Sequence, residues 1–238
     1  MKTPRNVLVA GASSGIGEAI ARAFAAQGDT VTATGATEVE VNVAKSRNDA
    51  AVRFVQLDVR DGAAVTQLVS ELGDLDVLVN CAGIIRRGQE HEPEVFEQVL
   101  DINLVGTMRL CAAARTGLAN KAGCIINTAS MLSFFGGGLV PAYSASKGGI
   151  AQLTKSLAIA YAEQGIRVNA IAPGWIATPL TQALQDDPER SAPILARTPM
   201  KRWGTPDDLV GPVLFLASSQ AQFVTGVVLP VDGGYLIA

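Results

Sequence analysis

The sequence is poor in histidine, cysteine and charged residues, and each shortage excludes a class of protein. Its three cysteines, Cys81, Cys111 and Cys124, are too few and too scattered for a disulfide framework or a zinc knuckle, which suits a reducing cytoplasm. The single histidine, His91, lies in a polar stretch that is typical of a solvated loop. Most zinc enzymes and most histidine-dependent mechanisms are therefore excluded, and we expect no metal site.

Charge and hydrophobicity limit the partners further. Charged residues make up 17% of the chain, and 19 basic side chains against 22 acidic ones give a net charge of -3. A nucleic-acid-binding protein normally carries a basic face, so we expect no nucleic acid as partner. With 48% hydrophobic residues the chain is not disordered. No stretch approaches the roughly 18 apolar residues of a membrane helix, so we expect a cytoplasmic protein that binds a small molecule.

The 238 residues favour one domain, 1–238, built on a parallel sheet. Short β-rich apolar runs recur between longer helical patterns, and both faces of each run are apolar, as in strands that helices cover on both sides. The runs are residues 6–10, 30–34, 54–58, 77–80, 124–127, 167–171 and 227–231. Seven such strands predict a Rossmann-type, doubly wound α/β fold whose ligands bind at the carboxyl edge of the sheet.

Two segments depart from the regular alternation. Residues 178–202 are polar and hold four prolines, and they follow the sixth predicted strand at the ligand edge. We expect this insertion to be a lid over the site. Residues 35–52 are short for a crossover, which leaves little room for a full helix between strands two and three.

A glycine loop follows the first predicted strand. Gly11, Gly15 and Gly17 lie at the start of a helix that is expected to run to about Gln27. Glycine permits a close approach of backbone to ligand, and the helix N-terminus presents free N–H groups to a pyrophosphate. The same loop satisfies the G-x-S-x-G pattern of a hydrolase nucleophile, but that class needs a histidine late in the chain. The position of the only histidine excludes the hydrolase.

Tyr143 and Lys147 are four residues apart at the start of a predicted helix, so their side chains share one face. A tyrosine titrates near 10 and is a poor base at neutral pH. Lowering its pKa to about 7 needs roughly 4 kcal/mol, and one positive charge about 4 Å away supplies about that much at an effective dielectric near 20. The pair therefore forms a candidate general acid/base for a hydroxyl or a carbonyl.

Together these motifs resemble the short-chain dehydrogenase/reductase family. The glycine loop, Asn80-Cys-Ala-Gly83, Asn103, Ser130, the Tyr143/Lys147 pair and Pro173-Gly174 follow one another in that family's order and spacing. The likeness runs from Val7 to about Gly234. It implies an NAD(P)-dependent oxidoreductase that interconverts a secondary alcohol and a ketone and forms a homotetramer.

The resemblance also assigns roles. Ser130 would position the substrate oxygen, Tyr143 would transfer the proton, Lys147 would bind the nicotinamide ribose, and Asn103 would hold a water in the proton relay. The residues implied in cofactor binding are Gly11, Ser13, Ser14, Gly15, Ile16, Gly17, Thr34, Asp58, Val59, Asn80, Ala82, Gly83, Tyr143, Lys147, Pro173, Gly174, Ile176 and Thr178. Two positions depart from the family pattern, because Ala10 replaces a threonine that braces the loop and Cys81 replaces a second asparagine.

The sequence leaves NAD or NADP open. An acid at the end of strand two would bind the ribose 2′-hydroxyl and repel the NADP phosphate, but the strand ends without one and the first acid is Glu38. Position 14 is serine, whereas an arginine there often marks NADP use in this family. The branch of the family described in the next paragraph is catabolic, which favours NAD.

Three stretches resemble the branch that oxidises sugar acids of the 2-deoxy- or 2-keto-3-deoxygluconate type. They are residues 82–87, residues 129–134 with 140–141, and residues 190–192 with 202–204. Such a substrate needs a cation for its carboxylate, and a guanidinium can supply two parallel hydrogen bonds. Arg86 and Arg87 follow strand four and Arg202 closes the expected lid, so Arg86 and Arg202, with Ser130 and Tyr143, form the expected substrate site. The alternatives are a 3-oxoacyl thioester reductase or general carbonyl reductase of the same family, and a catalytically silent nucleotide-binding protein.

Overall fold

The structure, a computed structural model, describes residues 3–47 and 51–238, and its centre is a parallel sheet of seven strands. The strands follow the order β3-β2-β1-β4-β5-β6-β7 across the sheet. Their bounds are β1 Asn6–Ala10, β2 Thr30–Gly35, β3 Val52–Gln56, β4 Val77–Asn80, β5 Cys124–Thr128, β6 Arg167–Pro173 and β7 Val228–Val231. The predicted doubly wound fold is confirmed, with only small shifts of strand ends, the largest being two residues, at β3 and at the end of β6.

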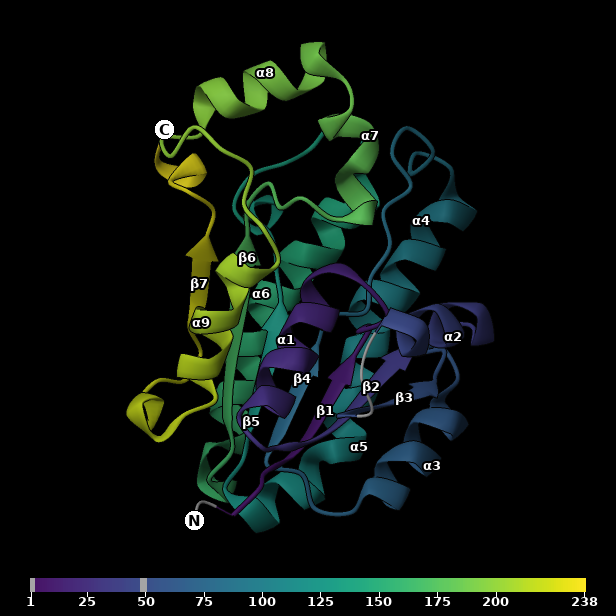
Figure 1. The fold of residues 1–238 in the computed structure, drawn as a ribbon, viewed down its shortest axis with the longest axis vertical. Coiled ribbons are helices and arrows are strands. Elements are labelled where there is room, and N and C mark those ends of the chain that lie inside the picture. Colours follow the sequence, from purple (N-terminus) through teal and green to yellow (C-terminus); the bar gives the residue numbers. More distant parts are fainter. Residues whose placement is uncertain (1–2, 48–50) are drawn as a thin grey trace.

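Helices cover both faces of the sheet (Figure 1). Their bounds are α1 Gly15–Ala26, α2 Glu38–Arg47, α3 Gly62–Leu72, α4 Pro93–Leu100, α5 Gly106–Lys121, α6 Pro141–Tyr161, α7 Gln182–Gln185, α8 Pro188–Arg197 and α9 Asp207–Leu216. Alternate residues of β1 enter different cores: Val7 and Val9 pack with α1, α2 and α9, whereas Leu8 and Ala10 pack with α3, α5 and α6. This two-sided burial explains why each strand reads as a continuous apolar run.

The expectation that little room remains for a helix between β2 and β3 is wrong. Helix α2 spans ten residues there, and residues 48–50 lie outside the described part of the chain. The helix begins almost directly after β2, because the Thr37 hydroxyl accepts a hydrogen bond from the backbone N–H of Glu40 and caps the first turn. A capped start makes a three-turn crossover possible in a short segment.

The segment 178–202 lies beyond the carboxyl ends of the strands, where α7 and α8 form the upper part of the molecule in Figure 1. The indole N–H of Trp203 donates a hydrogen bond to the Ser191 hydroxyl of α8. At the other end of α8, the Arg197 guanidinium lies 4.2 Å from the centroid of the Tyr235 ring. Both contacts fasten the segment to the C-terminal part of the chain at the ligand edge. Within residues 3–47 and 51–238, no helix is both long and apolar enough to cross a membrane.

Candidate active site

A cleft of about 560 Å³ opens at the carboxyl edge of the sheet and contains most of the residues that the sequence singled out. Those that line it are Gly11, Ser13, Ser14, Gly15, Ile16, Gly17, Thr34, Asp58, Val59, Ala82, Gly83, Ser130, Tyr143, Lys147, Pro173, Gly174, Ile176 and Thr178. Asn80, Asn103, Arg86 and Arg202 are not among the lining residues. The cleft therefore joins the glycine loop to the tyrosine–lysine pair.

The glycine loop packs too closely for side chains at two of its positions. Gly11 has φ 75°, and a Cβ there would lie 2.4 Å from the Cα of Ala82. A Cβ on Gly17 would lie 2.3 Å from the carbonyl oxygen of Gly11. Because only glycine fits these contacts, the loop can bring its backbone against the end of β4 and against a ligand.

The start of α1 has the donors that a pyrophosphate needs. Ser14 is the N-cap residue, and its side chain makes no capping hydrogen bond, so the first-turn N–H groups have no side-chain acceptor. The backbone N–H of Gly11 donates to the Thr34 hydroxyl at 3.2 Å. Thr34, on the neighbouring strand, thus supplies a brace for the loop where Ala10 cannot. This cradle fits the phosphates of a dinucleotide.

Ser130, Tyr143 and Lys147 meet at the other end of the cleft. The Ser130 hydroxyl lies close enough to Tyr143 to lower the pKa of the phenol. The Lys147 ammonium lies 5.5 Å from the centroid of the Tyr143 ring and donates to the backbone carbonyl of Thr128 at 2.6 Å. Helix α6 carries both Tyr143 and Lys147, so one turn of helix fixes their spacing.

The electrostatics of this pair differ from the sequence argument. Burial raises the pKa of Tyr143 above its usual value, and the nearby Ser130 hydroxyl only partly opposes that change. Burial also lowers the pKa of Lys147 to about 8. Desolvation is therefore the largest cause of both shifts, and the charge of Lys147 is not among the causes that act on Tyr143.

Asn103 lies beside this site and holds the loop that follows β4. It belongs to a five-residue π-helix, Asp101–Val105, inserted between α4 and α5, and such insertions are frequent at functional sites. Its side-chain oxygen accepts from the N–H of Ile84 at 2.8 Å, and its amide nitrogen donates to the Ser146 hydroxyl at 3.1 Å. A Cβ on Gly83 would lie 3.3 Å from this Asn103 oxygen and 3.8 Å from the Lys147 nitrogen. Asn103 is thus close to Lys147, as a proton relay would need.

Asn80 lies behind the cleft at the end of β4. Its amide nitrogen donates to the Asn127 side-chain oxygen at 2.9 Å, and its own oxygen is buried without a hydrogen-bond partner within the described residues. Cys81, which follows it, accepts a hydrogen bond from the Thr128 hydroxyl. These contacts connect β4 to β5 under the site.

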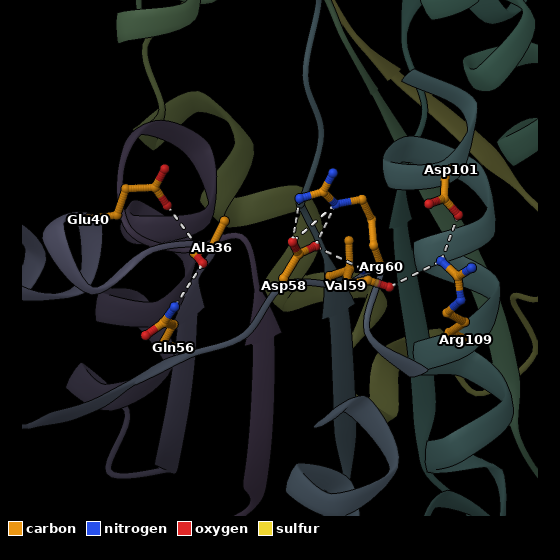
Figure 2. A network of polar contacts seen from close by, with 8 residues as sticks. All are labelled: Ala36, Glu40, Gln56, Asp58, Val59, Arg60, Asp101 and Arg109. Carbon is orange, nitrogen blue, oxygen red and sulfur yellow. Dashed lines mark hydrogen bonds and ion pairs between the residues drawn. The ribbon is translucent and has the colours of Figure 1, made fainter. Parts of the chain in front are cut away.

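The opposite end of the cleft carries three charged side chains (Figure 2). Asp58, just after β3, accepts hydrogen bonds from Arg60 on both carboxylate oxygens, at 2.6 to 3.0 Å, and this contact lowers the pKa of Asp58. Glu40, in the first turn of α2, accepts from the N–H of Ala36 at 2.8 Å. This end of the cleft is where the fold would place the adenosine of a dinucleotide.

Comparison with known proteins decides the family. Residues 11–236 match the family model described as Enoyl-(Acyl carrier protein) reductase. The chain is 42% identical over 243 residues to the 2-dehydro-3-deoxy-D-gluconate 5-dehydrogenases of Pseudoalteromonas atlantica and of Escherichia coli, covering 96% of this chain and 94% of each relative. The chain belongs to the short-chain dehydrogenase/reductase family.

A solved member of the family has the same architecture. The gluconate 5-dehydrogenase of Burkholderia cenocepacia, in complex with NADP and tartrate, is 34% identical and superposes with a TM-score of 0.92 over 100% of this chain and 97% of that one. The present chain is accordingly an NAD(P)-dependent oxidoreductase that acts on secondary alcohols.

The arginines of this dehydrogenase occupy different surroundings. The Arg202 guanidinium donates to both oxygens of Asp208, at 2.7 and 2.8 Å, outside the cleft. Burial raises the pKa of Tyr143, and the charge of Arg87 opposes that rise. Burial lowers the pKa of Arg87, and repulsion from Arg190 of α8 lowers it further. Of the three arginines, Arg87 is therefore the one whose charge reaches Tyr143.

Sequence reasoning missed two carboxylates of this dehydrogenase. Glu90 is fully buried and binds the N–H groups of Arg86 and Tyr143, each at 2.7 Å. Glu40 lines the cleft although it lies five residues beyond the end of β2. No local motif marks either residue. The only signal in the sequence was the position of each acid: Glu90 lies between β4 and α4, and Glu40 lies in the first turn of the helix that follows β2.

Proposed function

We propose that this oxidoreductase acts on a sugar acid of the 2-deoxy- or 2-keto-3-deoxygluconate type. The observation that carries the proposal is that one carboxylate, Glu90, holds the backbone N–H groups of Arg86 and Tyr143, at 2.7 Å each. This contact brings the next residue, Arg87, near enough to Tyr143 for its charge to act on the phenol. A substrate with a hydroxyl at Tyr143 and a carboxylate at Arg87 satisfies both groups. The two curated relatives are named for such a substrate, and the solved relative is a gluconate 5-dehydrogenase.

Ser130 and Tyr143 handle the oxygen of the substrate in this proposal. The Ser130 hydroxyl holds the substrate oxygen by a hydrogen bond, and the Tyr143 phenol oxygen takes the proton from an alcohol or returns it to a ketone. The bound nicotinamide supplies the hydride acceptor or donor. Lys147 binds the nicotinamide ribose, and its ammonium favours the phenolate once the ligand has displaced the remaining water. Asn103 keeps the loop after β4 in place and holds a relay water.

The cofactor-binding residues are proposed in three groups. The glycine loop and the first turn of α1 hold the pyrophosphate. The ends of β2 and β3, with Thr34, Asp58 and Val59, hold the adenosine. The segments after β4 and β6, at residues 80–83 and 173–178, border the nicotinamide. The cofactor itself is NAD or NADP, with a preference for NAD.

Segment 178–202 is proposed to act as the lid. It carries Arg190, the second cation near Arg87. Two like charges repel one another until an anion lies between them, so a substrate carboxylate would favour the closed arrangement of α8 over Arg87.

The decisive experiment compares three arginine variants on an acid and a neutral substrate. Arg86→Met, Arg87→Met and Arg202→Met are assayed on 2-dehydro-3-deoxy-D-gluconate and D-gluconate and on a neutral sugar alcohol, with NAD and with NADP. A charge-assisted hydrogen bond is worth about 1.5 to 3 kcal/mol, so loss of the carboxylate contact raises KM for the acid roughly 10- to 100-fold and leaves the sugar alcohol unaffected. We expect Arg87→Met to show this effect most strongly. If no variant loses its preference for the acid, the sugar-acid proposal is wrong.

A thioester reductase is the second candidate, because the matching family model is described as an acyl-carrier-protein reductase. The same assay with acetoacetyl thioesters tests it. A wild-type enzyme that prefers the thioester over every sugar acid would replace the proposed substrate and leave the oxidoreductase assignment intact.

We also propose a cytoplasmic homotetramer. The candidate contact residues are apolar side chains that the single chain leaves in solvent, among them Ile159 of α6 at 80% exposure and Ile237 near the C-terminus at 90%. Exposed apolar residues on a small-molecule enzyme are commonly covered by further copies of the same chain.

A further inference from the structure

Strand β2 ends at Gly35, at the position where an acid would meet the adenosine ribose of a dinucleotide. Gly35 has no side chain, and Ala36 follows it. The strand end therefore provides no group for the ribose hydroxyls by itself.

The carboxylate of Glu40 fills that gap. A Cβ placed on Gly35 would lie 3.3 Å from the Glu40 Oε2 atom and 3.0 Å from the Cβ of Ser13. The Glu40 oxygen thus lies beside the place where a side chain at the strand end would begin. The chain has turned back over four residues to bring it there, and the turn is fixed by the hydrogen bond from the Ala36 N–H to Glu40 at 2.8 Å (Figure 2).

Glu40 also belongs to the cleft wall on the side of the glycine loop. Its Oε2 atom is 3.4 Å from the Ser13 hydroxyl, and both residues line the cleft. Within the described residues, no hydrogen bond or ion pair is recorded for its other oxygen, Oε1. One carboxylate oxygen therefore organises the loop, and the second can accept a hydrogen bond from a ligand.

Cations at this end of the cleft are already paired. Within the part of the chain that the structure describes, Arg60 and Lys147 are the basic residues of the cleft wall, and Lys147 belongs to the catalytic end. Arg60 binds both oxygens of Asp58. Arg47, behind the loop, donates to the Ser13 carbonyl oxygen and pairs with Glu18 at 3.1 Å. A 2′-phosphate would therefore meet the charge of Glu40 without an unpaired arginine to offset it.

We propose that Glu40 makes this dehydrogenase select NAD over NADP. Its carboxylate accepts a hydrogen bond from the ribose 2′-hydroxyl of NAD and repels the 2′-phosphate of NADP, so one group supplies both the attraction and the rejection. The inference rests on the proposed function only in assuming that a nicotinamide dinucleotide lies in the cleft, and it is independent of the substrate.

Arg60 is the group that could defeat this selection. Its pair with Asp58 is exposed, with side-chain exposures of 46% and 37%, and exposed pairs are worth little. If Arg60 left Asp58 for the 2′-phosphate, NADP would bind well despite Glu40. The experiment must therefore separate the two residues.

The test measures dissociation constants of NADH and NADPH by calorimetry without substrate, so it stands even if the sugar acid is wrong. The variants are Glu40→Gln, Arg60→Ala and, as the matched control, Glu38→Gln from the same helical turn but outside the cleft. We expect wild type to bind NADH more tightly, roughly 10- to 100-fold, the equivalent of one hydrogen bond to a charged group. In Glu40→Gln this preference for NADH over NADPH should be at least about tenfold smaller. Glu38→Gln and Arg60→Ala should keep it.

A measurement on wild type covers the case in which a variant folds poorly. Salt screens the repulsion between Glu40 and the 2′-phosphate, so the NADPH/NADH ratio of dissociation constants should fall as salt rises. An attraction between Arg60 and the phosphate would make the ratio rise instead. A wild-type preference for NADPH, an unchanged ratio in Glu40→Gln, a loss of NADPH binding in Arg60→Ala, or a ratio that rises with salt would each overturn the proposal.

Discussion

The carboxylate of Glu90 accepts a hydrogen bond from the backbone N–H of Tyr143, 53 residues further along the chain, at 2.7 Å. The other oxygen of the same carboxylate accepts from the N–H of Arg86 at 2.7 Å. Glu90 is fully buried, so it joins the loop after β4 to the first turn of α6 without competition from water. This contact holds the backbone from which the Tyr143 side chain extends.

The first prediction concerns Glu90 as a positioning residue. Glu90→Gln replaces one acceptor by an amide that faces a backbone N–H, so we expect a loss of roughly 1 to 3 kcal/mol in the free energy of unfolding and a fall in kcat. The negative charge of Glu90 raises the pKa of Tyr143. Removing it should lower that pKa, and the tyrosine limb of the pH–rate profile should move to lower pH. Urea unfolding and pH-dependent kinetics measure both effects.

The control for Glu90 is Glu92→Gln, two residues away, because Glu92 is exposed and its side chain caps nothing at the start of α4. Its stability and its pH profile should match those of wild type. A Glu90→Gln enzyme that loses stability without any shift of the profile would show that the residue supports the fold and not the phenol.

The second prediction concerns the proton itself. Tyr143→Phe keeps the ring beside Lys147 and Ser130 but removes the group that exchanges a proton with the substrate. General acid/base catalysis contributes about 10²- to 10⁴-fold, so kcat should fall by at least about 100-fold. NADH should still bind, as calorimetry can check. Turnover near that of wild type would show that another group carries the proton.

The third prediction concerns the stability cost of Lys147. Its pKa is about 8 in the folded protein against a usual 10.5, because burial disfavours the ammonium. Below pH 8 both states hold the proton and the cost is fully present, about 3 kcal/mol. Between pH 8 and 10.5 the unfolded state binds more protons, so stability rises with pH. Lys147→Met should therefore be more stable than wild type at pH 7, by less than this amount because the Thr128 carbonyl loses its donor.

The measurement for Lys147 is urea unfolding of both proteins at pH 7 and pH 9 without ligand. About 1 kcal/mol of the difference between them should disappear over that range, because only wild type releases the proton. The buried thiols of Cys111 and Cys124, whose pKa values burial raises, are present in both proteins and cancel in the comparison. Burial also raises the pKa of Cys81, but the charge of Lys147 opposes that rise, so both proteins carry Cys81→Ala to remove this coupling. A wild-type protein more stable than Lys147→Met at pH 7 would mean that the lysine pairs favourably even without cofactor.

Sequence reasoning succeeded where a residue type is forced by its own surroundings. The apolar strands, the glycines at Gly11 and Gly17, and the i, i+4 placement of Tyr143 and Lys147 follow from short-range geometry, and the structure has all of them. It failed where the fold brings distant groups together. Glu90 meets Tyr143 across 53 residues, and Lys147 is desolvated by elements that no local pattern specifies.

The helix α2 shows a different kind of failure. Its length was misjudged because the cap at Thr37 lets the helix begin immediately after the strand. The same tight turn carries Glu40 back to the end of β2. Because β2 ends in Gly35, the sequence predicts no acid at the strand end, but the first turn of α2 supplies Glu40 there.

The last prediction concerns assembly. Ile159 is 80% exposed on the long helix α6, whose other side packs in the core through Leu157 and Tyr161. If this exposed face of α6 forms a contact between subunits, Ile159→Asp would bury a charge there at a cost of several kcal/mol. Light scattering at micromolar concentration should give wild type a mass of four times 24.7 kDa and this variant a smaller one.

The control is Val39→Asp on α2. Val39 is also apolar and is 72% exposed, and its variant should keep the wild-type mass. Because both variants add the same charge to an exposed helix position, a smaller mass for Ile159→Asp alone locates the contact on α6. A monomeric wild type would refute the tetramer, and an unchanged mass for Ile159→Asp would move the contact to another face of the chain.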